Sequence, residues 1–269
     1  MLKKSNIEEI DFIRLYQEQH EKSFFKSKTK DEWNKKADEF NKKSSGSVYN
    51  EEFVKRVNFT KSDTFLDVGC GSGNLTLCFA KTASFVHSLD FSPKMLEILR
   101  ENADKDGLKN IKTHELSWND NWDSVPSADI VIASRSMEVD DIKDALLKLH
   151  KKAKKRVYLT YKVGGSFVDK NSLNIIKKDI NPKPDYIYIV NALYQLGINA
   201  SVDFIQSEGR GAFLSLADDY VKSIEWSLGE LNHNEKMDLK NYFDSLSNEE
   251  KKYLNEAYQW AFIHWEKNE

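Results

Sequence analysis

The sequence contains only two cysteines, Cys70 and Cys78, among its 269 residues. Both fall in what is predicted to be one loop and the helix that follows it. They therefore fit neither a disulfide framework nor the spacing of metal ligands. The sequence thus predicts no metal site and a reducing, cytoplasmic environment.

Long apolar stretches are also absent. No segment approaches the roughly 20 apolar residues that a membrane-spanning helix needs. After Met1 the chain turns acidic and amphipathic at Ile7–Ile10, where a secretory signal would place its apolar core. We therefore expect a cytoplasmic protein that does not enter a membrane.

The third absence is an excess of basic residues. The formal net charge is −3 and the isoelectric point is about 6.1, whereas proteins that neutralise many phosphates are usually basic. Nucleic acid is therefore not a favoured partner. The basic run at His150–Arg156 is interpreted as a helix C-terminus whose charges complement the helix dipole.

Short apolar runs alternate with helical patterns from Thr64 onward, which is typical of a parallel sheet covered on both faces. We predict an α/β fold with a doubly wound, mostly parallel, seven-stranded sheet, preceded by N-terminal helices. A helical excursion is expected before the last strand. The strands are expected at residues 64–68, 85–89, 111–116, 129–133, 156–163, 200–206 and 258–265.

A glycine-rich turn follows the first predicted strand and contains Gly69, Gly71 and Gly73. Glycines at a strand-to-helix turn let a ligand approach the backbone closely. Asp67 precedes this turn, and its carboxylate would repel a dinucleotide pyrophosphate but attract the ammonium of S-adenosylmethionine. Asn74 also replaces the third glycine of the dinucleotide fingerprint, so an NAD-dependent dehydrogenase is disfavoured.

Asp90 ends the second predicted strand, where a carboxylate can accept hydrogen bonds from two ribose hydroxyls. The alternative is that Asp90 only precedes a helix start, because Ser92 can cap that helix and Pro93 can occupy its first position.

Residues 30 to 165 resemble the class I, Rossmann-like methyltransferases, whose acidic residue and Gly-x-Gly-x-Gly motif match Asp67 and the three glycines. The resemblance implies S-adenosylmethionine as cofactor and S-adenosylhomocysteine as product. It places the ribose-binding acid at Asp90 and the adenine segment at Ser117–Trp118, although the family commonly has Asp where this chain has Ser117. The remaining expected cofactor contacts are Cys70 and Phe91, the backbone of Ser134, and Trp33.

The family's domain organisation predicts a helical lid at residues 1–45 and a methyltransferase domain at 46–269, with the helical excursion at about 207–256. Trp33 closes over the methionine end of the cofactor in this interpretation, and in the alternative it only packs its helix. The aromatic run Trp260–Trp265 is expected to be a buried strand. An exposed run would instead favour a binding interface.

The Asn/Asp-Pro-Pro-aromatic motif of enzymes that methylate amino groups of nucleobases is missing after the fourth predicted strand. No catalytic residue is assigned. Arg135 either holds a carboxylate or phosphate of the acceptor or pairs with Glu138 or Asp140. A general base is needed only if the acceptor arrives protonated. The candidate bases are Tyr16, His20, Glu138, Lys162 and His264.

The sequence therefore predicts an S-adenosylmethionine-dependent methyltransferase whose acceptor is a small molecule. Methylation of RNA or protein is the first alternative. A non-catalytic S-adenosylmethionine-binding or scaffold protein is the second.

Overall fold

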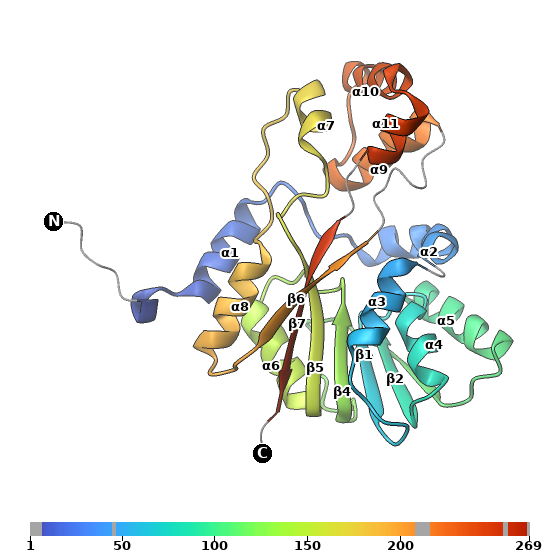
Figure 1. Cartoon of the computed structure of the whole chain (residues 1–269), viewed down its shortest axis with the longest axis vertical. Coiled ribbons are helices and arrows are strands. Elements are labelled where there is room, and N and C mark those ends of the chain that lie inside the picture. The colour runs from blue at the N-terminus through green and yellow to red at the C-terminus, as the bar shows by residue number, and fades with distance from the viewer. Residues whose placement is uncertain (1–6, 45–46, 208–215, 255–257, 268–269) are drawn as a thin grey trace.

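A single seven-stranded sheet organises the protein, as a computed structural model that describes residues 7–44, 47–207, 216–254 and 258–267 shows (Figure 1). The strand order is β3-β2-β1-β4-β5-β7-β6, in which β7 alone runs antiparallel to its two neighbours. The strands are β1 (Thr64–Val68), β2 (Phe85–Asp90), β3 (Ile111–Glu115), β4 (Ala128–Ser134), β5 (Ala153–Lys162), β6 (Ser201–Gln206) and β7 (Gln259–Glu266).

The predicted Rossmann-like, mostly parallel sheet is confirmed, and helices cover both of its faces. Central strands such as β1 are buried along nearly their whole length, which explains their continuous apolar sequence. One face packs against α1 (Phe12–Lys22), α6 (Ile142–Lys152) and α8 (Tyr186–Gln195). The other packs against α3 (Val48–Arg56), α4 (Asn74–Ala80) and α5 (Pro93–Lys105).

The remaining helices lie beyond the carboxyl ends of the parallel strands (Figure 1). The predicted excursion before the last strand is confirmed and has its own apolar core around Tyr220, Ile224 and Phe243. These helices are α2 (Lys30–Ser44), α7 (Lys170–Ile175), α9 (Ala217–Leu228), α10 (His233–Ser245) and α11 (Asn248–Tyr253), and a short 3-10 turn, η1 (Ile7–Glu9), precedes α1. The predicted boundary at residues 45–46 falls outside the described residues.

Local signals placed one helix start correctly and one helix end incorrectly. Ser92 caps α5 by accepting a hydrogen bond from the backbone N–H of Met95, and Pro93 occupies the first turn. The basic run at His150–Arg156, in contrast, is only partly helical. Helix α6 ends at Lys152, and Ala153–Arg156 already belongs to β5 because this segment pairs with β4.

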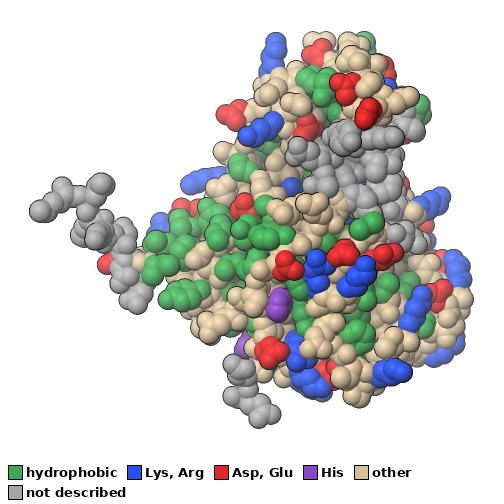
Figure 2. All heavy atoms as spheres, viewed as in Figure 1, with side chains coloured by type: hydrophobic (Ala, Val, Ile, Leu, Met, Phe, Trp, Pro, Cys, Tyr) green, Lys and Arg blue, Asp and Glu red, His purple; other side chains and the backbone are tan. Residues whose placement is uncertain are grey.

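The aromatic run at the chain's last strand is buried, as expected. Trp260 and Trp265 are only 9% and 2% exposed, because β7 lies between β5 and β6. Exposed apolar side chains gather instead over α1 and α8, where Leu15, Ile187 and Tyr194 are on the surface (Figure 2). Within the described residues, no helix is long and apolar enough to cross a membrane.

Candidate functional site

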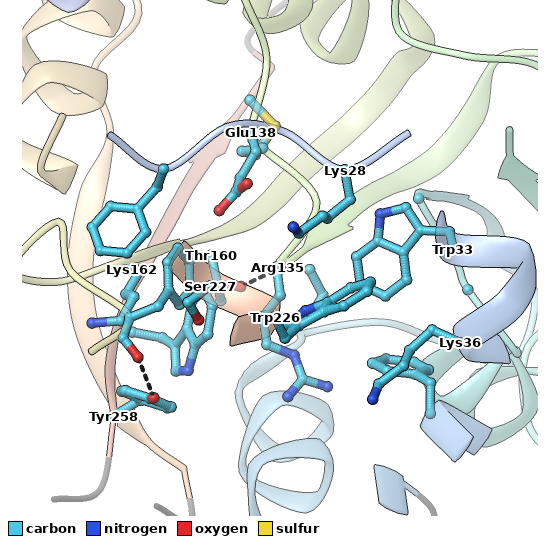
Figure 3. Close-up of a pocket in the computed structure, with 18 of the residues that line it drawn as sticks. Lys28, Trp33, Lys36, Arg135, Glu138, Thr160, Lys162, Trp226, Ser227 and Tyr258 are labelled. Atoms are coloured by element: carbon cyan, nitrogen blue, oxygen red, sulfur yellow. Dashed lines mark hydrogen bonds between the residues drawn. The ribbon is translucent and has the colours of Figure 1, made fainter. Parts of the chain in front are cut away.

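A cavity of about 650 Å³ lies at the carboxyl ends of β1, β2, β4 and β5, beneath α2 and α9 (Figure 3). Its volume is within the range of small-molecule sites. The strand order reverses between β1 and β4, and ligands of open α/β sheets bind at such a switch point. The fold therefore places the glycine turn and the end of β2 on one wall of the cavity.

Gly69 and Gly71 form the part of the turn that lines the cavity, with φ angles of +68° and +54°. A Cβ atom on Gly69 would lie 2.3 Å from the Cβ of Ser136. Ser136 is held there because its hydroxyl donates to the Val68 carbonyl at 2.7 Å. Both the backbone conformation and this close contact therefore require glycine at position 69.

Gly73 serves a different purpose, because it packs α4 against α5. Its φ is +90°, and an added Cβ would lie 2.6 Å from Cγ of Leu99. Gly73 is not among the described residues that line the cavity. The third glycine thus fixes the position of the helix that follows the turn.

Asp90 brings a buried carboxylate to the cavity wall. One of its oxygens accepts the Gly71 N–H at 2.8 Å, and the other accepts the Ser92 N–H at 2.9 Å. Burial raises the pKa of this carboxyl. Asp90 therefore ties the glycine turn to the end of β2 and presents its carboxylate where two hydroxyl groups of a ligand can reach it.

Asp67 lies behind the glycine turn and is not among the cavity-lining residues. Its carboxyl accepts a hydrogen bond from the Thr76 hydroxyl at 2.7 Å, and that hydroxyl also lies 2.9 Å from Ser88 Oγ. Burial raises the pKa of Asp67 to about 7. A direct contact between Asp67 and the cofactor stays a prediction.

The structure brings together six of the eleven predicted cofactor residues in the cavity wall. These six are Trp33, Gly69, Gly71, Asp90, Phe91 and Ser134. Asp67, Cys70, Gly73, Ser117 and Trp118 lie outside it. Ser117 donates from both its N–H and its hydroxyl to Asp120, and the Trp118 indole donates to the Ser136 carbonyl at 3.0 Å. Ser117 thus orders its own loop, and Trp118 ties that loop to the segment after β4.

Two of the five candidate bases, Glu138 and Lys162, line the cavity. Glu138 forms an ion pair with the buried Lys183, which also lines it. The other three candidates have different surroundings: Tyr16 donates to the Val139 carbonyl, His20 contacts Asp140, and His264 stacks on Tyr158. Of the five candidate general bases, only Glu138 and Lys162 are therefore among the described residues that line the cavity.

Comparisons with known proteins identify the family to which this chain belongs. A family model described as a methyltransferase domain matches residues 59–182. An uncharacterized protein of Haemophilus influenzae is 38% identical over 262 residues, covering 96% of this chain and 97% of that protein. The chain belongs to the class I, Rossmann-like methyltransferases.

Solved structures show the same fold for this methyltransferase chain. YcgJ of Bacillus subtilis superposes with a TM-score of 0.56 at 14% identity, covering 82% of this chain and 98% of YcgJ. Phosphoethanolamine N-methyltransferase 2 of Haemonchus contortus, in complex with phosphomonomethylethanolamine and S-adenosylhomocysteine, superposes with a TM-score of 0.52 at 16% identity. That match covers 82% of this chain and 52% of the nematode protein.

Sequence reasoning did not single out Trp226, which α9 contributes to the methyltransferase cavity. The indole of Trp226 contacts that of Trp33 at a centroid distance of 5.5 Å, with Lys28 4.8 Å from its ring (Figure 3). Trp226 lies off the apolar stripe of Val221 and Ile224. A large aromatic residue on the polar face of an amphipathic helix was the available signal.

No metal centre is apparent in the described part of the methyltransferase. No group of three or more His, Cys, Asp or Glu side chains is arranged there to hold an ion. The two cysteines are free thiols, of which Cys70 is buried and Cys78 exposed.

Proposed function

We propose that this chain transfers a methyl group from S-adenosylmethionine to a small molecule bound in the same cavity. The observation that carries the proposal is the junction of Gly69, Gly71 and Asp90. Two glycines leave the backbone bare, and a buried carboxylate faces the same space. This combination suits a ligand that packs directly against the protein backbone at one end and carries a ribose at the other.

The residues present fit this cofactor. Asp90 would accept hydrogen bonds from the ribose hydroxyls, and Phe91 would pack against the adenine. The bare turn at Gly69 and Gly71 would receive the methionine portion, and Asp67 lies buried behind this turn. S-adenosylmethionine, when bound, supplies an activated methyl group on its sulfonium.

The protein's own contribution to the reaction is chiefly alignment, because the methyl group is already activated. The acceptor would lie beyond Ser134, at the carboxyl ends of β4 and β5. Glu138 is the group best placed to take a proton from an acceptor that arrives protonated. Its carboxylate forms an ion pair with the neighbouring Lys183.

Replacing Asp90 with asparagine is expected to weaken S-adenosylmethionine binding by about 100-fold, because charge-assisted hydrogen bonds of a buried carboxylate are lost. Calorimetry on wild-type protein should show micromolar binding of S-adenosylmethionine and S-adenosylhomocysteine and none of NAD. Asp104→Asn is the matched control, since Asp104 is exposed and pairs only with Lys109 in the described structure.

Failure of well-folded wild-type protein to bind either sulfur compound would refute the proposed function. Binding of NAD in their place would revive the dehydrogenase interpretation. Equal affinities in Asp90→Asn and Asp104→Asn would show that Asp90 does not contact the ribose.

We also propose that residues 1–45 form a lid over the cofactor, with Trp33 as its contact. The contact between Trp33 and Trp226 joins α2 to α9 at the cavity wall. Trp226→Ala should accelerate S-adenosylhomocysteine release by about tenfold, the value of one aromatic pair. Stopped-flow displacement measures this rate, and Tyr194→Ala, an exposed aromatic on α8, is the control. Unchanged release from Trp226→Ala would contradict the lid.

The choice of a small molecule over RNA or protein rests on the size of the cavity, about 650 Å³, and on the acidic net charge. Incubation with donor labelled in the methyl group, and with extract separated into small molecules, RNA and protein, tests this choice directly. Label in the RNA or protein fraction alone would overturn it. A non-catalytic role would give donor binding without label in any fraction.

A further inference from the structure

The cavity carries more positive than negative charge, although the whole chain is acidic. Among the described residues that line it, seven lysines and arginines face four carboxylates. Two of these carboxylates, Glu39 and Glu138, already form ion pairs with lining lysines. A third, Asp90, accepts backbone hydrogen bonds on the cofactor side. Lys28 and Lys36, just before and within α2, pair with Glu32 and Glu39. Arg135 and Lys162 instead lie at the ends of β4 and β5, where the acceptor is proposed to bind.

Arg135 is one of these lining cations and directly follows the end of β4. Its φ is +55°, a strained conformation for a residue with a side chain. A hydrogen bond stabilises this conformation: the backbone N–H of Arg135 donates to Oγ1 of Thr160 at 3.0 Å. Such outliers cluster at ligand-binding positions, and here the conformation directs the side chain into the cavity (Figure 3).

The guanidinium of Arg135 lies over an anchored aromatic ring. Its central carbon is 4.2 Å from the centroid of Tyr49. Tyr49 is fully buried, and its hydroxyl is fixed 2.8 Å from Ser134 Oγ and 2.7 Å from Thr160 Oγ1. Stacking of this kind leaves the edge of the guanidinium, with its fork of N–H donors, available to a ligand.

Neither of the carboxylates expected to neutralise Arg135 does so. Glu138 pairs with Lys183, and Asp140 contacts His20. Within the described residues, no carboxylate forms an ion pair with Arg135. A half-buried, rigidly placed guanidinium with no counter-ion among the described residues suits an oxyanion, because a planar carboxylate or a phosphate matches its donor geometry.

Aromatic rings line the cavity around this site. Lys162 holds its ammonium 4.7 Å from the ring of Tyr258 and 5.4 Å from that of Phe167, and Trp226 of α9 lines the same cavity beside Trp33 (Figure 3). Rings on several sides suit a flat, apolar body. The second cation beside them suits a negative charge on or near that body.

We propose that the methyl acceptor is an anionic molecule with a ring-bearing body, whose carboxylate or phosphate binds Arg135. This inference rests on the proposed function and specifies its substrate class. Arg135 is then the residue that determines acceptor charge, and the rings of Phe167, Trp226 and Tyr258 receive the body.

The test uses full-length protein saturated with S-adenosylhomocysteine and three probes of one shape: 2-naphthoate, 2-naphthyl phosphate and the neutral 2-naphthamide. Calorimetry should show that at least one anionic probe binds the wild type about tenfold or more tightly than the amide. Arg135→Gln should abolish this preference, and Arg135→Lys should keep part of it. Arg14→Gln, which removes an exposed arginine on α1, should leave it unchanged.

The two anionic probes distinguish a carboxylate acceptor from a phosphate acceptor. The inference is overturned if wild-type protein binds neither anion more tightly than the amide, or if it binds none of the probes. It is also overturned if Arg135→Gln keeps the preference for an anion. Binding of S-adenosylhomocysteine is measured in the same samples and confirms that each variant is folded. Loss of that binding in the wild type refutes the proposed function, whereas its retention without an anion preference refutes only the acceptor class.

Discussion

Gly69→Ala is expected to lower the free energy of unfolding by about 3 kcal/mol and to remove S-adenosylmethionine binding. About half of this cost arises because alanine is strained at a φ of +68°. The rest arises because the new methyl group would lie 2.3 Å from the Cβ of Ser136. Relief of that clash must move the turn or the segment after β4, and both line the cavity.

Gly107→Ala provides a matched control for this substitution. Gly107 has a φ of +70°, nearly the same as Gly69, but no atom lies within 4 Å of the position of an added Cβ. Its replacement should therefore cost only the backbone strain, about 1–2 kcal/mol, and should leave cofactor binding intact. Urea denaturation and calorimetry measure the two effects. Equal stability losses, with binding retained in Gly69→Ala, would show that the turn tolerates a side chain.

The second large effect concerns the pH dependence of stability. Burial raises the pKa of Asp67 from 3.8 to about 7. A raised carboxyl pKa means that the folded state binds the proton more tightly than the unfolded state. Its contribution to stability is therefore complete below pH 3.8 and is lost as the pH rises through 7. The full loss is about 4 kcal/mol for a shift of this size.

Asp67→Asn removes this ionisation. The stability difference between wild type and Asp67→Asn should consequently fall by about 3 kcal/mol between pH 4.5 and pH 7.5, as followed by urea unfolding without ligand. Asp104→Asn, at an exposed position, should give a profile parallel to the wild type. Parallel profiles for Asp67→Asn and wild type would mean that Asp67 titrates normally and is hydrated.

The elements of the site that sequence could predict are those with local causes. The glycine turn, Asp90 and the cap at Ser92 each follow from conformational needs within a few residues. The sheet could be predicted because parallel strands covered on both faces read as continuous apolar runs. These features account for the cofactor side of the cavity.

The acceptor side depends on contacts between distant segments, which no local pattern encodes. One alternative was that Arg135 forms an ion pair with Glu138 or Asp140. In the structure Glu138 pairs with Lys183 instead, and the guanidinium of Arg135 lies over the ring of Tyr49. The sequence did not indicate the hydrogen-bond partner of Asp67, which is the hydroxyl of Thr76 on α4, behind the turn. Residue type and spacing identified these side chains without fixing their partners.

The contact between Trp33 and Trp226 has a thermodynamic consequence. It joins α2, the helix proposed to cover the cofactor, to α9, the helix proposed to cover the acceptor. A ligand that orders either helix therefore lessens the entropic cost of ordering the other. By linkage the effect is mutual: whatever factor the cofactor adds to the affinity for the acceptor, the acceptor must add to the affinity for the cofactor.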